Sequence, residues 1–169
     1  MNLFFSDEKM IEFENLLDFN AEIVYLEEVY SQKKSVQLLT TILTLSWYYA
    51  IEGNVNQNPA NYDQLFFLSK WREYIAIGIK DYFGSFEFCL LAGYTLSLHG
   101  FYLLGHMDAV GQALISKSKT LATKEEERLL SSFFENRKGF KEKEKLLQLK
   151  EKLFSGEVLI NRYFNEIIY

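Results

Sequence analysis

The fold is decided by Phe88-Cys89-Leu90-Leu91-Ala92-Gly93-Tyr94-Thr95-Leu96-Ser97-Leu98-His99-Gly100-Phe101-Tyr102-Leu103-Leu104, a run without a charged side chain. Its 17 residues lie at the lower edge of what a membrane-spanning helix needs. The run contains two glycines, a serine and a histidine, it has no basic flank, and the mean hydropathy of the chain is -0.10. A helix surrounded by other helices has the same pattern, so we predict a buried central helix and no membrane span.

A second run, residues 38–51, is also apolar or small on every helical face and predicts another central helix. In the first run, Gly93 and Gly100 lie seven residues apart, so both fall on one face of the helix. Glycine costs about 1 kcal/mol relative to alanine inside a helix. We therefore expect these two glycines to be required by packing, because they allow another helix to approach closely.

Helical spacing of apolar residues extends over almost all of the 169 residues, which include one Pro and nine Gly. Near the C-terminal end, apolar pairs at 159–160, 163–164 and 167–168 recur every four residues and predict one stripe of a helix. Thr123 and Glu126 have the spacing of a capping box, in which both side chains bind free backbone amides at a helix start.

These patterns predict an all-α fold. We expect a single helical domain over residues 1–169, with eight or nine helices in stacked antiparallel hairpins that form a bundle or a short solenoid. Residues 53–59 are rich in turn-forming types and predict a long loop. The helices are expected near residues 7–18, 20–31, 34–53, 61–83, 86–104, 106–121, 124–137, 139–155 and 157–168.

The sequence contains no recognisable catalytic or metal-binding motif. On one helix His99 and His106 would lie about 10 Å apart, too far to share a metal ion. No Glu-x-x-His pair is present, and neither histidine has an arginine at the spacing used by one class of all-α ribonucleases. The only cysteine, Cys89, lies in an apolar run and is expected to be buried. We predict no enzymatic activity, no metal and no cofactor.

Charge is distributed unevenly along the chain. Residues 1–31 carry eight acidic side chains against Lys9 alone, and residues 117–169 carry a net charge of +3. The basic stretch 137–152 includes three glutamates and an apolar stripe, which is typical of a solvated amphipathic helix. With a pI near 5.2, the whole molecule repels a polyanion, so we expect no nucleic-acid partner.

The acidic segment has two interpretations, between which charge alone does not decide. Either it complements the basic tail within the fold, or it attracts a basic partner protein. Small size, acidity, aromatic residues and a start without a secretory signal favour a cytoplasmic immunity protein that neutralises a basic bacterial nuclease toxin. The expected partner-binding residues are Glu12, Glu14, Asp18, Glu22, Glu27 and Glu28.

An adaptor is the alternative function. Stacked helical hairpins have a concave face that can hold a peptide or a partner protein. Such an adaptor would be favoured by a shallow groove lined by Tyr48, Tyr49, Tyr94 and Tyr102. A flat acidic face would favour the inhibitor instead.

Overall fold

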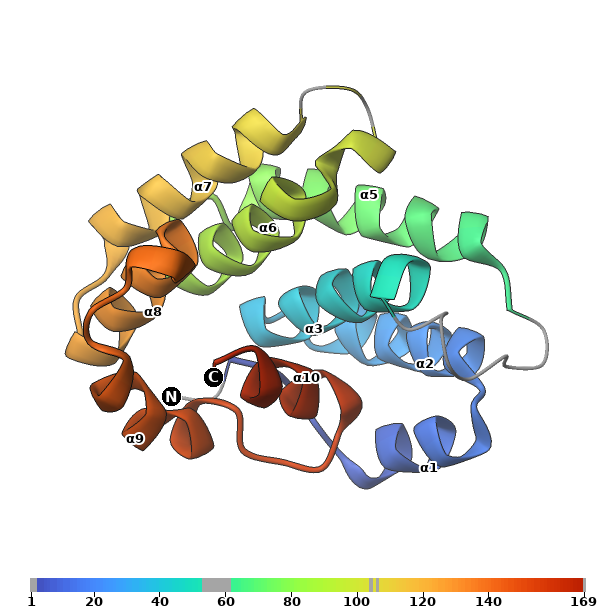
Figure 1. The fold of residues 1–169 in the computed structure, drawn as a ribbon. Helices are drawn as coiled ribbons and strands as arrows, with labels where there is room; N and C mark the ends of the chain where they lie inside the picture. Colours follow the sequence, from blue (N-terminus) through green and yellow to red (C-terminus); the bar gives the residue numbers. More distant parts are fainter. Residues whose placement is uncertain (1–2, 53–61, 104, 106, 169) are drawn as a thin grey trace.

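The computed structural model describes residues 3–52, 62–103, 105 and 107–168 (Figure 1). These residues form nine α-helices and no strand, which confirms the all-α prediction. The predicted loop at 53–59 lies outside the described residues. The α-helices are α1 (Glu8–Leu16), α2 (Phe19–Gln32), α3 (Val36–Trp47), α5 (Gln64–Asp81), α6 (Phe86–His99), α7 (Met107–Leu121), α8 (Glu125–Glu135), α9 (Lys143–Leu153) and α10 (Leu159–Ile167).

Two of the predicted helices end earlier than their apolar patterns suggested. After Trp47 the backbone continues as a π-helical turn, η1 (Tyr48–Glu52), and α6 passes into a 3-10 turn, η2 (Gly100–Tyr102). A second 3-10 turn, η3 (Arg137–Gly139), precedes α9. Such turns keep the side chains at helix-like positions, so apolar periodicity alone does not reveal where the α-helix ends.

Most helix starts follow from short polar side chains. Asp or Ser side chains accept a backbone N–H in the first turn of α1, α2, α3, α5 and α6. The predicted capping box at α8 is displaced by one residue. Helix α8 begins at Glu125, and Glu127 instead of Glu126 accepts the N–H groups of Thr123 (2.8 Å) and Lys124 (3.2 Å).

Consecutive helices pack as hairpins, with α2 against α3, α3 against α5, α6 against α7 and α7 against α8. Glycines allow α6 and α7 to pack closely. A Cβ atom on Gly93 would lie 2.8 Å from the Ile115 nitrogen, and one on Gly100 would lie 2.7 Å from the carbonyl carbon of Met107. The prediction that these glycines allow a close helix approach is therefore confirmed. Gly111, which the sequence did not single out, is tighter still, because its Cβ would lie 2.3 Å from the Ser97 nitrogen.

The hairpins follow one another around an arc, and the C-terminal helix α10 lies on the inner side of this arc (Figure 1). Phe164 of α10 is fully buried, and its ring contacts four aromatic rings from separate segments. The ring centroids of Phe4, Tyr94, Phe134 and Phe154 lie 5.2, 5.5, 6.0 and 5.5 Å from that of Phe164. Helix α10 is thus the inner wall of the core.

Helix α6 contains most of the charge-free run and is buried among its neighbours from Phe88 to Leu96. It has 14 residues, against the roughly 20 that a membrane span requires. None of the helices in the described part of the chain combines the length and the apolar character needed to cross a membrane.

Candidate protein-binding face

Helix α1 presents acidic side chains on its outward side. Asp7 caps the helix by accepting the Met10 N–H at 3.0 Å, and Glu8 adds a negative charge in the first turn, where the helix dipole favours it. Glu8 and Glu12 are both exposed and lie one turn apart. Leu16 continues the same stripe after another turn and is 69% exposed. An apolar side chain therefore lies in line with two carboxylates.

Glu14 lies on the opposite side of α1 and is buried. Its Oε1 and Oε2 accept the backbone N–H of Leu159 at 2.7 and 2.9 Å, and its Oε2 lies 3.4 Å from Nη2 of Arg162. Helix α10 has no side-chain cap of its own, so Glu14 performs that role across the fold. Burial raises the pKa of Glu14 above its ordinary value, although the Leu159 amide and Arg162 oppose the rise.

Glu22 is fully buried inside α2. Its Oε2 accepts the hydroxyl of Tyr49 at 2.5 Å, and the Tyr49 ring stacks on Phe19 with centroids 4.2 Å apart. Burial raises the pKa of Glu22 to about 8, with the Tyr49 hydroxyl opposing the rise and the Glu14 charge adding to it. Glu22 is therefore mostly neutral at pH 7 and does not lie on the molecular surface.

Glu27 joins α2 to α5. Its Oε1 lies 2.7 Å from Nζ of Lys70 and accepts the hydroxyl of Tyr74 at 3.2 Å. Asp18 and Glu28 are exposed, and the Asp18 carboxylate also caps α2 by accepting the Ala21 N–H at 3.2 Å.

Three of the six acidic residues expected to bind a partner are thus exposed, and Glu14, Glu22 and Glu27 have structural contacts. A neighbouring apolar residue, Val24, is 46% exposed and lies one turn before Glu28 on α2. Leu16 and Val24 were not predicted as part of this surface. Each lies four residues from a glutamate, Glu12 or Glu28, and this spacing places both members of a pair on the same side of a helix. The exposed residues Glu8, Glu12, Leu16, Asp18, Val24 and Glu28 lie on α1, on α2 and between them, and these two helices pack on each other. We refer to these six residues together as the acidic face.

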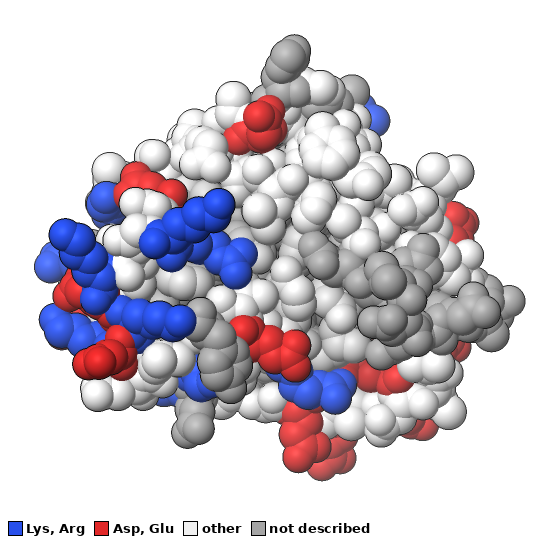
Figure 2. Space-filling model, in the orientation of Figure 1, with Lys and Arg blue, Asp and Glu red and all other residues white. Residues whose placement is uncertain are grey.

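Positive charge gathers elsewhere on the molecule. Figure 2 shows most of the Lys and Arg of this face on the left side, where Figure 1 places α8 and α9, with some Asp and Glu among them. Further Asp and Glu lie near the top and along the lower and right edges. Lys145 and Lys152 form ion pairs with Glu142 (2.9 Å) and Glu126 (3.9 Å), within or beside that basic region. The Glu14–Arg162 pair does join the acidic segment to the tail. Pairing with the basic tail therefore explains the position of Glu14. The residues of the acidic face stay exposed to solvent.

His99 and Cys89 have packing contacts. Trp47 Nε1 donates to His99 Nδ1 at 3.3 Å. Cys89 is fully buried, its thiol donates to the Phe83 carbonyl at 3.3 Å, and burial raises the pKa of this thiol to about 11. A thiol with so high a pKa is a poor nucleophile at neutral pH. Within the described ranges, no three His, Cys, Asp or Glu side chains are grouped to hold a metal, and His106 lies outside these ranges.

Comparisons of the chain with protein-family models, with curated proteins and with solved structures gave no match. The acidic face combines carboxylates, which attract a positively charged surface from a distance, with exposed apolar side chains, which contribute binding energy on contact.

Proposed function

We propose that this chain is a non-catalytic inhibitor that binds a basic protein through the acidic face. The supporting observation is the placement of Leu16 and Val24, both exposed, at helical spacing from exposed glutamates. Carboxylates that served only solubility would not need apolar neighbours. Together they have the composition of an interface in which charge steers the partner and apolar contact holds it.

The partner class we propose is a bacterial toxin of the nuclease type, with this chain as its cytoplasmic immunity protein. Nucleases that bind nucleic acid carry positive charge where they contact phosphates. An acidic inhibitor can cover that surface, associate rapidly, and disfavour partners of the wrong charge. The net charge of -5 and the uneven distribution of acidic residues fit this role.

The adaptor is less well supported than the inhibitor. Of the four tyrosines expected to line a peptide groove, Tyr49 and Tyr94 are buried in the core. Helix α10 packs on the inner side of the arc, where a bound peptide would otherwise lie.

The test is to co-express the chain with the product of the neighbouring gene and to assay nuclease activity in the purified complex. We expect one equivalent of the chain to abolish the activity. In stopped-flow measurements at low salt, Glu12→Lys and Glu28→Lys should each slow association by about tenfold, because surface charges act mainly on the association rate.

Glu144→Lys is the matched control. It makes the same change in net charge on α9, away from the acidic face, and should alter association much less. The proposal fails if the nuclease keeps its activity in the presence of the chain. It also fails if all three variants slow association equally, because only net charge would then matter.

A further inference from the structure

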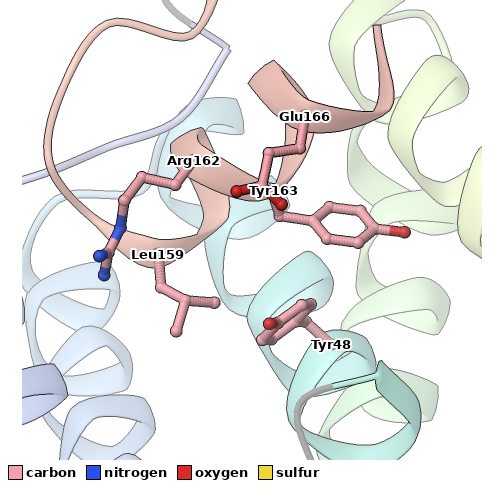
Figure 3. A pocket seen from close by; sticks show the side chains of 5 residues that line it. All are labelled: Tyr48, Leu159, Arg162, Tyr163 and Glu166. Atoms are coloured by element: carbon pink, nitrogen blue, oxygen red, sulfur yellow. The ribbon is translucent and has the colours of Figure 1, made fainter. Parts of the chain in front are cut away.

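A hollow of about 220 Å³ lies between η1 and α10 (Figure 3). Its lining residues are Tyr48, Leu159, Arg162, Tyr163 and Glu166. Cofactors and drug-sized ligands occupy pockets of roughly 300–1,000 Å³, so this hollow is too small for them. One water occupies about 30 Å³ of liquid, so the hollow has the volume of roughly seven waters. That volume is sufficient for one long side chain.

Two tyrosine rings form one wall of the hollow. The rings of Tyr48 and Tyr163 meet edge to face, with centroids 5.2 Å apart and an angle of 64° between their planes. Both side chains are half-buried, which leaves part of each ring open to the hollow. The negative face of an aromatic ring attracts a cation within about 6 Å of its centroid.

The charged residues of the lining differ in their contacts. Arg162 is paired with Glu14, and in Figure 3 its guanidinium points away from the tyrosine rings. Glu166 lies one helical turn after Arg162, and Figure 3 shows its carboxylate directed into the space between Arg162 and Tyr163. Within the described part of the chain, the Glu166 carboxylate has no hydrogen bond or ion pair. Because Arg162 is turned toward Glu14, the charged group nearest the tyrosine rings is the carboxylate of Glu166.

We infer that this hollow receives one lysine or arginine side chain of the basic partner, an assignment that rests on the proposed function. The aliphatic stem would lie against Leu159, and the cationic end would lie between the tyrosine rings and Glu166. The molecule already holds a cation in this manner, because Nζ of Lys9 lies 4.3 Å from the ring centroid of Tyr25.

A neighbouring hollow links this one to α1. A second hollow of about 370 Å³ shares Arg162 with the first and extends between α1 and the segment before α10. Its other lining residues are Ile11, Glu14, Asn15, Gly156 and Glu157. On α1, Ile11 and Asn15 lie between the buried Glu14 and the exposed Glu8 and Glu12. A partner docked on α1 that also covers this second hollow would reach the hollow lined by Tyr48 and Tyr163.

The inference can be tested without the partner, by NMR titration of the full chain with ¹³C-labelled tyrosine rings. The probes are Nα-acetyl-arginine amide and Nα-acetyl-lysine amide, with Nα-acetyl-norleucine amide as the neutral control and Nα-acetyl-glutamate amide as the anionic one. We expect the two cations to shift the Tyr48 and Tyr163 signals saturably. Glu166→Gln should weaken that binding by about threefold or more, as loss of one partly exposed ion pair implies.

Glu157→Gln is the matched control, because it neutralises an exposed carboxylate in the second hollow, and it should leave the titration unchanged. Equal shifts with norleucine amide, or preferential shifts with the glutamate probe, would overturn the assignment. So would an unchanged cation affinity in Glu166→Gln.

A second measurement separates this inference from the proposed function. If the chain inhibits the nuclease and Glu166→Gln binds it as tightly as the unmodified chain, the hollow is not part of the interface and the inference fails alone. If the cations bind as expected but no nuclease is inhibited, the proposed function fails and the cation-binding hollow stands.

Discussion

At the residue scale, the burial of Glu22 opposes its ionisation. Its carboxyl group is fully enclosed, with Tyr49 as its hydrogen-bonding partner. The ordinary carboxyl pKa of 4.5 is raised to about 8 in the folded protein. Below pH 4.5 both folded and unfolded chains are protonated, and Glu22 has no effect on the pH dependence. Between pH 4.5 and 8 the unfolded chain ionises and the folded one does not, so folding stability falls across that window.

This conflict predicts that Glu22→Gln stabilises the protein at alkaline pH. A shift of this size corresponds to an effect on the order of 5 kcal/mol above pH 8, which local relaxation would reduce. Because glutamine stays neutral in both states, we expect the variant to be at least about 2 kcal/mol more stable than the unmodified chain at pH 9. At pH 4 the two should be nearly equal. Urea unfolding at both pH values measures the difference.

The exposed Glu28→Gln is the control and should show no comparable gain. Equal stability of Glu22→Gln and the unmodified chain at pH 9 would mean that Glu22 ionises in place without cost. The burial of Glu22 was open to prediction, because it lies three residues after Phe19 and four before Leu26, on the stripe that faces the core. The spacing of Phe19, Glu22 and Leu26 is therefore a better guide to the position of Glu22 than the acidity of the segment.

At the element scale, the α6–α7 hairpin depends on glycines, because a side chain at these positions would keep the two helices apart. We predict that Gly111→Ala destabilises the protein by about 3 kcal/mol, because the added methyl group meets the Ser97 nitrogen and the Leu96 carbonyl carbon, which belong to backbone. Thermal or urea unfolding measures the loss.

Gly84→Ala is the matched control, since nothing lies within 4 Å of its added Cβ, and its effect should stay within about 1 kcal/mol. If both variants have the same stability, the helices can separate without cost and close packing is not what Gly111 provides. The sequence indicated Gly93 and Gly100 because they interrupt a buried helix. Gly111 lies in an amphipathic helix whose partner was unknown, so its close contact could not be predicted.

At the scale of the whole molecule, helix α10 joins the two ends of the arc. Phe164 contacts rings from the N-terminal segment, α6, α8 and the end of α9. We predict that Phe164→Ala costs about 4 kcal/mol, the range for removing a large aromatic side chain from a packed core. Phe101→Ala removes the same atoms from a side chain that is 62% exposed and should cost less than about 1 kcal/mol.

Urea unfolding monitored by circular dichroism compares the two phenylalanine variants, and similar losses would show that α10 does not close the core. The apolar repeat at 159–168 was enough to predict α10 as a helix. Its place inside the arc was not predictable, because it depends on contacts between residues far apart in the sequence. The same limit applied to Glu14, whose partner Leu159 is 145 residues away.

That separation has a consequence for the order in which the chain folds. The Gly93–Gly111 contact closes a short loop, whereas the Glu14–Leu159 bond closes one about eight times longer, at an entropic cost about 2 kcal/mol greater. We therefore expect the hairpins to form first and α10 to dock last. Folding should be slow for an all-α protein, because its final step depends on long-range contacts. Until then the inner aromatic surface is open to water, and the chain is most prone to aggregate in that interval.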